Sequence, residues 1–366
     1  MGMGLTENQR SLARLLGEWA TSAGTTRLTK DSEDRGPKVF ETVWDSLTDL
    51  GVPGIPVPEA LGGAGGSLLD VAVAVEACAG AMVPGPVLPT LLAAVVLSAE
   101  KETLEGIAEG SLCVGVGMGG STVRLEGGRA SGEATLLWGA RMTTRLLVPT
   151  VGAEWLLLPA GEGANVAMAP PVDLSCRVGA VQLDALPVGA AGVLPLDRVR
   201  LHEVAVVLAS AEAAGIARWC LDTAVAYAKV REQFGRPIGS FQAIKHLCVE
   251  MLEAVESATA VAWDAAGAFG DEPDQFSMAA AVAGAVALDA AVVTAQNAIQ
   301  VLGGIGFTWE HDVHLYLRRA MVNRQLVGGS DFWRLRLADL ALAGVRRRPQ
   351  VDLGGAADRV RTQVRP

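Results

Sequence analysis

Two arginines in a glycine-containing loop form the first segment whose residue types could do chemistry. The stretch REQFGRPIGSFQ runs from Arg231 to Gln242, between two segments with helical spacing. The guanidinium groups of Arg231 and Arg236 carry forked donors that match phosphate oxygens. Glycines in the loop let a ligand approach the backbone, and free N–H groups at the start of the next helix favour an anion. A phosphate-binding loop is therefore predicted, with a solvated interhelical turn as the alternative.

A second segment, QVLGGIGF, runs from Gln300 to Phe307 and places a glycine pair after a helical pattern. A helix C-terminal stop explains one of the two glycines. It explains neither Gly304 nor the amide of Gln300. Because no strand precedes the glycines, this is not a dinucleotide-fold fingerprint. A bare backbone beside an amide can instead pack against the adenine and ribose of a nucleotide.

These segments must be positioned by long helices, because an apolar period near 3.6 persists through residues 201–345. Helices are expected over 203–231, 240–268, 277–302, 311–325 and 330–344. Short connections between long amphipathic or apolar helices are typical of a four-helix-type bundle. The bundle is predicted to hold both segments.

The rest of the chain has two different sequence patterns. Residues 1–110 predict a helical domain, with Thr6 capping the first helix and Gly51 ending the second. Residues 111–200 contain short β-type runs separated by glycine turns, which predict a small barrel or sandwich. Residues 346–366 are expected to be a flexible tail. The predicted fold class is mainly α with a central β domain.

Composition excludes several function classes. The 366 residues carry a net charge of −10, whereas a general nucleic-acid binder needs a basic face. Five scattered cysteines without a CxxC pair favour a reducing cytoplasm over a disulfide framework or zinc site. The uncharged run 77–99 contains Pro84, Pro86 and Pro89, so it is not expected to be a continuous membrane helix. The N-terminal stretch lacks the apolar core of a signal peptide.

The two segments, together with VPEALGGAGGS near the N-terminus, resemble the acyl-CoA dehydrogenase family along the whole chain. The resemblance implies FAD as cofactor and oxidation of an acyl-CoA thioester to the 2,3-enoyl-CoA. In that family both segments contact the ADP half of an FAD held mainly by a neighbouring subunit. By resemblance, the contact residues here are Arg231, Gln233, Phe234, Gln242, Gln300 and Gly304.

The chain departs from the family where a carboxylate should remove the α proton of the thioester, a base that must be fixed and partly desolvated. One family location is a Glu before Gly-Thr, which matches Val327 here. The other, counted back from Tyr227, reaches Ala205. Glu203 lies on a different helical face from Ala205, and Asp331 is expected to cap a helix. The catalytic base is therefore expected to be absent, with Glu203 or Asp331 as possible substitutes.

The β segment also departs from the family pattern. The usual Thr-Glu-Pro stretch is replaced by VGVGMGGSTVRLEGG, and Met142-Thr143-Thr144 takes the place of the usual Trp-Ile-Thr. The part of the site that would hold the chain's own flavin ring is thus predicted to lack its usual residues. This combination resembles the non-catalytic subunit of heteromeric α2β2 acyl-CoA dehydrogenases of actinobacteria. That resemblance implies a homologous partner subunit, an electron-transfer flavoprotein or similar acceptor, and bulky steroid-derived CoA thioesters as substrates.

Two other functions stay open at this point. One is a self-sufficient homomeric dehydrogenase with a displaced base, and the other is a flavin-free structural partner. His311 and His314 share a helical spacing, but no carboxylate or cysteine cluster surrounds them, so metal binding is not expected. Trp309 and Trp333 are expected to pack in the core rather than to line a cleft.

Overall fold

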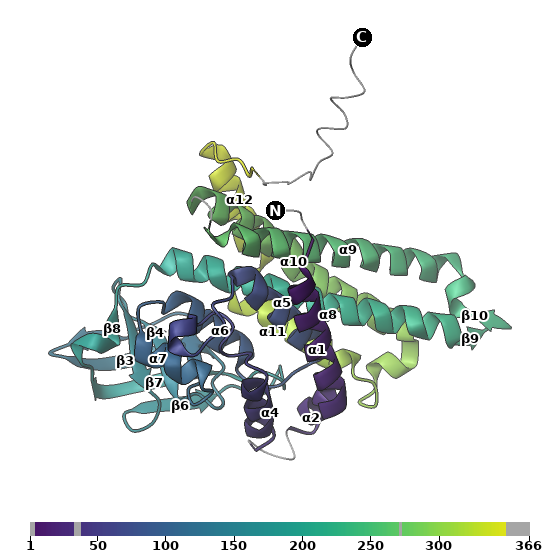
Figure 1. Ribbon diagram of the computed structural model, residues 1–366. Coiled ribbons are helices and arrows are strands. Elements are labelled where there is room, and N and C mark those ends of the chain that lie inside the picture. The colour runs from purple at the N-terminus through teal and green to yellow at the C-terminus, as the bar shows by residue number, and fades with distance from the viewer. Residues whose placement is uncertain (1–3, 33–37, 271–272, 349–366) are drawn as a thin grey trace, which may run out of the picture.

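The computed structural model describes residues 4–32, 38–270 and 273–348. Helices come first along the chain, a sheet follows, and a bundle of long helices completes it (Figure 1). The predicted fold class is confirmed. The tail expected from residue 346 lies, from residue 349 onward, outside the described residues.

The first part of the chain is helical. Its helices are α1 (Glu7–Ala23), α2 (Thr25–Lys30), α4 (Lys38–Asp49), α5 (Leu68–Gly80), α6 (Val87–Val96) and α7 (Lys101–Ala108), with a 3-10 turn at Glu59–Leu61. Thr6 caps α1 as predicted, because its hydroxyl accepts the Gln9 N–H at 3.2 Å. The 77–99 run is not one continuous helix, as expected, because α5 ends at Gly80 and α6 begins at Val87. Pro86 is the N-cap of α6 and Pro89 lies in its first turn, where a missing N–H costs no intrahelical bond.

Among the described residues, eight strands form one sheet. They are β1 (Val114–Gly117), β2 (Arg124–Glu126), β3 (Arg129–Trp138), β4 (Arg145–Pro149), β5 (Trp155–Pro159), β6 (Ala164–Met168), β7 (Val178–Pro187) and β8 (Val193–Leu194). The strand order is β6-β7-β3-β1-β4-β5-β8, and β2 pairs with β3. The β1–β4 pair is parallel, with Val114 opposite Arg145, and the others are antiparallel.

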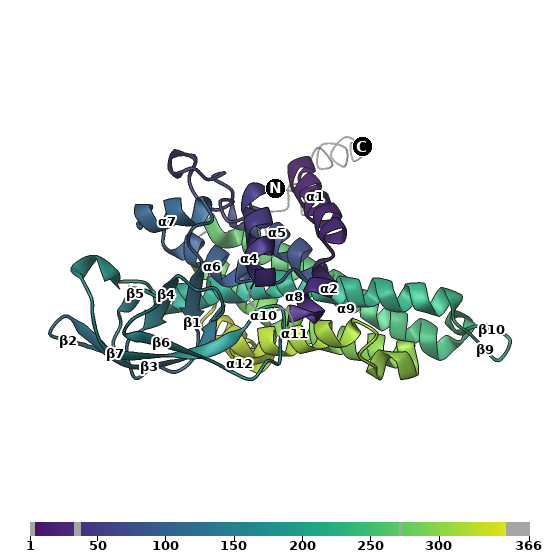
Figure 2. The same ribbon diagram turned by 90° about the horizontal axis from the view of Figure 1, so that it is seen from below.

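Long helices form the C-terminal bundle. They are α8 (Arg198–Val230), α9 (Gln242–Gly267), α10 (Pro273–Leu302), α11 (Val313–Leu326) and α12 (Gly329–Leu342). Helix α8 starts five residues earlier than predicted, because the Asp197 carboxylate caps it by accepting the Val199 N–H at 2.9 Å. Small residues let α10 pack closely: a Cβ on Gly284 would lie 2.5 Å from the Trp333 ring. Helices α8, α9 and α10 run side by side toward one end of the molecule (Figure 2).

Two helical stretches of the bundle are long and apolar enough to cross a membrane by length and composition alone. They span Arg198–Val230 and Pro273–Phe307. In the most apolar window of each, 89% and 72% of the residues are buried inside the protein. Helices that are apolar on all sides lie in the interior of a folded domain, covered by other helices. The burial of these two stretches is therefore what we expect of central helices in the bundle.

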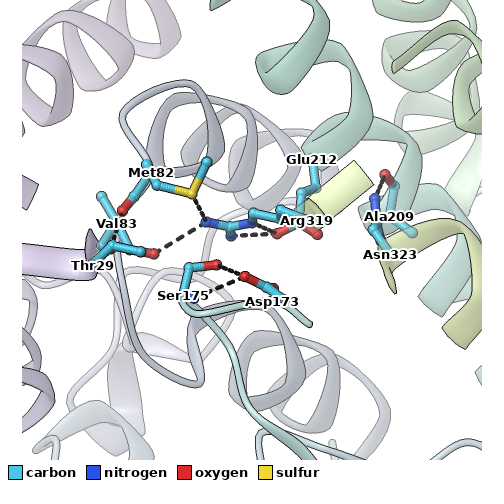
Figure 3. Close-up of polar contacts among 9 residues, drawn as sticks. All are labelled: Thr29, Met82, Val83, Asp173, Ser175, Ala209, Glu212, Arg319 and Asn323. Carbon is cyan, nitrogen blue, oxygen red and sulfur yellow. Dashed lines mark hydrogen bonds and ion pairs between the residues drawn. The ribbon is translucent and has the colours of Figure 1, made fainter. Parts of the chain in front are cut away.

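A buried polar cluster around Arg319 brings together residues from the three parts of the chain (Figure 3). The Arg319 guanidinium of α11 donates to the Glu212 carboxylate of α8 through Nε at 2.9 Å and through a second nitrogen. It also donates to the carbonyl of Val83, in the turn before α6, at 3.2 Å. The Asp173 carboxylate, in the segment before β7, lies near the same charge and accepts the Ser175 hydroxyl at 2.7 Å.

Arg319 is the only base in this group of buried charges. Its side chain and that of Glu212 are 5% and 4% exposed. Burial opposes the arginine charge, but the Glu212 and Asp173 carboxylates together raise the pKa of Arg319. The arginine therefore stays charged, and its removal would leave two carboxyl groups buried without a counter-charge.

Replacing Arg319 alone is expected to destabilise the protein strongly. For Arg319→Met we expect a loss of about 3–5 kcal/mol in the free energy of unfolding, measured by urea denaturation, because buried acids lose their partner. The double variant Arg319→Met, Glu212→Leu is expected to recover part of that loss, because one of the two buried acids is removed while Asp173 still lacks its counter-charge. Arg10→Ala, which breaks an exposed pair with Glu7, is the matched control and should cost at most about 1 kcal/mol. Equal losses in Arg319→Met and the control would contradict this role.

Candidate functional site

A tight hairpin follows α8 at the far end of the bundle. Strands β9 (Glu232–Gln233) and β10 (Arg236–Pro237) pair with Arg236 opposite Gln233. The two residues between them, Phe234 and Gly235, have φ angles of 55° and 74°. Two positive φ angles are what a two-residue turn of the type I′ class needs. The hairpin projects from the end of the bundle (Figure 1, Figure 2).

Aromatic contacts hold the hairpin against the start of α9. The Phe234 and Phe241 rings meet edge to face at 6.0 Å between centroids. The Arg236 guanidinium lies 4.2 Å from the centroid of the Phe241 ring, a cation–π contact. Phe234 is nevertheless 93% exposed. An aromatic ring that is held in place and left in solvent is suited to contact another molecule.

The glycine segment lies beside this hairpin. Helix α10 ends at Leu302, and a 3-10 turn, η5, spans Gly303–Phe307. Gly303 has a φ of 64°, so its conformation favours glycine. A Cβ on Gly306 would lie 2.9 Å from the Ile299 carbonyl oxygen. A Cβ on Gly304 would meet nothing within 4 Å in the described chain. Gly304 therefore leaves open space beside the backbone that a bound group could fill.

The two segments together form one cavity of about 440 Å³. It is lined by Tyr227, Arg231, Gln233, Ile238, Val301, Leu302, Gly303, Gly304 and Ile305. Sequence analysis placed Arg231, Gln233 and Gly304 at one ligand, and the fold brings these three to the same cavity. Phe234, Gln242 and Gln300 are exposed at the same end of the bundle but do not line it. The contacts of all six residues with FAD stay predictions.

The charge in this cavity is uncompensated within the described part of the chain. The Arg231 guanidinium has neither a hydrogen bond nor an ion pair with any described residue. Gln233 donates to the neighbouring Glu232 carbonyl at 2.7 Å, so its amide oxygen remains available. A free guanidinium, an amide and a bare glycine backbone fit the pyrophosphate and ribose of a nucleotide. These observations are compatible with the ADP half of FAD.

Sequence analysis did not single out the cavity's apolar walls. Tyr227 lines the cavity one helical turn before Arg231. Helical spacing could have identified it, because residues i and i+4 share a face. Ile238 and Val301 carry no comparable signal in the sequence. Their positions depend on how α8 and α10 pack against each other.

At the expected base position, the structure places a buried apolar side chain. Val327 is buried, and its carbonyl accepts the indole N–H of Trp333 at 2.8 Å. The His202 Nε2 lies 3.1 Å from the same carbonyl oxygen. Burial lowers the pKa of His202, so this ring is neutral and donates through Nε2. Two donors thus fix the backbone at the position where the family has a carboxylate.

Neither candidate acid forms a hydrogen bond with Val327 in the described chain. Glu203 is buried, and burial raises its pKa, although Ser277 and the arginines Arg200 and Arg336 oppose the shift. Its Oε1 lies 3.9 Å from the Arg336 guanidinium on α12. Asp331 is 95% exposed and pairs with Arg334 at 2.7 Å. The expectation that Asp331 caps a helix was wrong, because the N-cap of α12 is Gly328 and Asp331 lies in the first turn.

Two tryptophans and two histidines were also singled out from the sequence. Trp333 is buried, as expected. The expectation was wrong for Trp309, which is 51% exposed and stacks on His314 at 4.5 Å. His311 Nδ1 accepts the Val313 N–H at 3.1 Å. Within residues 4–32, 38–270 and 273–348, no group of three His, Cys, Asp or Glu side chains could hold a metal ion.

Hydroxyls in the β region are used within the chain. The Thr143 hydroxyl donates to the Gly139 carbonyl at 2.5 Å, and that of Thr144 donates to the Cys113 carbonyl at 3.1 Å. Ser121, in the stretch that replaces Thr-Glu-Pro, donates to the Pro149 carbonyl at 2.5 Å. These side chains join strands and loops of the sheet, so their hydroxyl hydrogens are already engaged.

Comparison with known proteins gives the family. The acyl-CoA dehydrogenase N-terminal domain matches residues 6–100, and the acyl-CoA dehydrogenase C-terminal domain matches residues 202–342. Acyl-CoA dehydrogenase FadE34 of Mycobacterium tuberculosis is 43% identical over 96% of this chain. The chain spans half the length of that relative. Acyl-CoA dehydrogenase IpdE2 of Mycolicibacterium smegmatis is 35% identical over 78% of this chain and 83% of its own length.

Solved structures agree with this assignment. The ChsE4–ChsE5 complex from Mycobacterium tuberculosis matches with a TM-score of 0.85 and 26% identity, over 94% of this chain and all of the matched one. A variant of the Tcur3481–Tcur3483 steroid ACAD matches with a TM-score of 0.82 and 27% identity, over 92% and 98% of the two chains. These likenesses confirm the predicted resemblance to actinobacterial enzymes of the heteromeric type. The chain therefore belongs to the acyl-CoA dehydrogenase family, whose members bind FAD and oxidise a CH–CH bond of acyl-CoA thioesters.

Proposed function

We propose that this chain is the non-catalytic subunit of a heteromeric acyl-CoA dehydrogenase and contributes the ADP end of an FAD site in a homologous partner. In the reaction of the complex, a carboxylate of the partner removes the α proton of the thioester. FAD would supply the acceptor for the β hydride, so that the product is the 2,3-enoyl-CoA. An electron-transfer flavoprotein or a similar acceptor is the proposed electron partner of the complex.

The cavity at the end of the bundle carries this proposal. Its guanidinium, Arg231, is unpaired among the described residues, and its glycine, Gly304, leaves room that no described residue fills. The neighbouring Phe234 and Phe307 are 93% and 79% exposed. An exposed aromatic, a free cation and bare backbone at one projecting end are the features of a surface completed by another molecule. Because the hairpin projects from the bundle, a ligand there can be shared with a neighbouring subunit.

The lack of a proton acceptor supports the non-catalytic role. A general base must reach the proton that it removes and must keep that geometry. The side chain at the family position is that of Val327, which cannot accept a proton. Asp331 is 95% exposed and paired with Arg334, so it is not the fixed, partly desolvated base that the reaction needs. Glu203 is buried against Arg336, on the side of α8 that faces α12.

The name of one similar structure supports a bulky substrate. One matched structure is described as a steroid ACAD, at 27% identity to this chain. We therefore propose steroid-derived CoA thioesters as the substrate class. A cytoplasmic complex is also proposed, because the cysteines Cys78, Cys113, Cys176, Cys220 and Cys248 are all free in the structure.

The ratio of flavin to protein tests the proposal. Co-expression with a homologous partner is expected to give a yellow heterotetramer with about one FAD per pair of chains, because each flavin needs one subunit of each kind. Each chain expressed alone should be colourless and inactive. Absorbance of the flavin and the protein, with native mass spectrometry, measures both quantities. A yellow homotetramer that bleaches with acyl-CoA would identify a self-sufficient enzyme, and a colourless complex would identify a structural partner.

Loss of the cavity's charge should weaken FAD retention. In the co-expressed complex, Arg231→Ala is expected to cost about 1.5–3 kcal/mol of FAD binding, or roughly 10–150-fold in Kd, because a charge-assisted contact is lost. Equilibrium dialysis followed by flavin fluorescence measures this. Arg10→Ala, on the exposed surface of α1, is the matched control and should retain FAD like the wild type. Unchanged Kd in Arg231→Ala would refute the assignment of this residue.

Neutralising the two candidate acids should leave turnover nearly intact. Glu203→Gln and Asp331→Asn are isosteric and, in the complex, are expected to change kcat by less than roughly tenfold, whereas loss of a general base costs about 10²–10⁴-fold. Steady-state kinetics of the heteromer, with an artificial electron acceptor, checks this. A fall of several orders of magnitude in either variant would place the base in this chain.

A further inference from the structure

A second cavity, of about 290 Å³, lies between α1, α5, α8 and α9. It is lined by Leu5, Ala13, Val73, Glu76, Ala77, Gly80, Gly215, Arg218, Trp219, Asp222 and Trp263. None of these residues lines the cavity at the end of the bundle. The proposed FAD site therefore does not explain it.

The floor of this cavity is formed where two helices touch through their backbones. A Cβ on Gly215 of α8 would lie 2.1 Å from the Glu76 carbonyl oxygen of α5. A Cβ on Gly80 would lie 3.3 Å from the Gly215 carbonyl oxygen. No side chain therefore fits between α5 and α8 at this crossing. The residues on either side, among them Val73 and Ala77, then form the walls of a mainly apolar cleft.

One carboxylate in the cleft has a hydrogen-bond donor for only one of its two oxygens. Glu76 Oε2 accepts the indole N–H of Trp263 on α9 at 2.7 Å. Within the described chain, no donor is found for its Oε1. Burial raises the pKa of Glu76 to about 7, against the opposing effects of the Trp263 bond and of Arg218. The carboxyl group thus lacks a counter-charge strong enough to keep it fully ionised.

The other charges that face Glu76 do not supply that counter-charge. Arg218 of α8 donates to Glu256 of α9 at 2.5 Å, so its charge is already shared. Asp222 of α8 adds a second acid to the lining. Leu5 and Ala13, from the N-terminal segment, are uncharged. The cleft therefore holds more acid than free base.

We propose that this cleft binds a small primary ammonium compound with a short apolar body, and that the Glu76 carboxylate pairs with the ammonium group. The Glu76 Oε1, which has no donor within the described chain, accepts the N–H donors of the ligand, and Trp219 and Trp263 line the cleft beside it. Val73 and Ala77 contact the carbon chain. A volume of about 290 Å³ is at the lower end for ligand cavities, which limits the body to a few carbons.

Binding of n-butylammonium to the purified full chain, by isothermal titration calorimetry, tests the proposal. The amine stays protonated at pH about 6 and about 8, whereas Glu76, with a pKa of about 7, goes from roughly one-tenth to nine-tenths ionised. We therefore expect a Kd roughly tenfold lower at the higher pH. The neutral isostere n-butanol should bind more weakly and without dependence on pH. Equal affinity for the amine and the alcohol would overturn the ammonium assignment.

Variants separate this site from a non-specific effect. Glu76→Gln is expected to abolish the pH dependence and to weaken amine binding at least roughly tenfold. Glu253→Gln, on the exposed surface of α9, is the matched control and should bind like the wild type. Ala13→Leu should also weaken binding by filling the cleft, which keeps the test valid if Glu76→Gln folds poorly. Amine binding that persists in both Glu76→Gln and Ala13→Leu, or is absent from the wild type, would overturn the proposal, whatever the flavin content of the complex.

Discussion

A single buried arginine determines how the parts of this protein fit together. Arg319 donates to a carboxylate of α8 and to the backbone turn before α6, and it lies beside Asp173 in the segment before β7. The Thr29 hydroxyl of α2 donates to the Met82 carbonyl in the same turn at 2.8 Å. Segments far apart in the sequence therefore share one polar cluster (Figure 3). A buried charge tolerates little displacement, since each lost contact leaves a desolvated group without a partner.

This constraint reaches the proposed site through the long helices. Glu212 lies in the middle of α8, and the same helix ends at Val230, directly before the hairpin. Helix α11 carries Arg319, and the Asn323 amide one turn later donates to the Ala209 carbonyl of α8 at 2.8 Å. Because α8 and α11 are held together at their centres, the hairpin keeps a defined direction. A surface that must meet a neighbouring subunit needs such a rigid support.

The proposed function divides a family site between two chains. Val327 stands where the family pattern has a proton acceptor, and its carbonyl accepts from the Trp333 and His202 side chains. Hydroxyls in the β region join the sheet to its own loops. At the far end of the bundle, in contrast, Arg231 and Gly304 have no use within the described chain. Groups that stabilise the fold and groups that are available to a ligand therefore lie in different parts of the protein.

Much of the fold and part of the site could be predicted from the sequence, because local patterns determine them. The apolar period determined the helices of the bundle, Thr6 marked a cap, and the two motifs predicted that Arg231, Gln233 and Gly304 lie together, as they do at one cavity. Only the tertiary structure decided that Tyr227, Ile238 and Val301 complete that cavity, that Asp331 is solvated, and that Trp309 lies outside the core. The cleft at Glu76 likewise depends on the contact of Gly80 with Gly215, which are 135 residues apart by their sequence numbers. Burial and the pairing of charges are properties of contacts between distant segments, so the order of residues along the chain does not contain them locally.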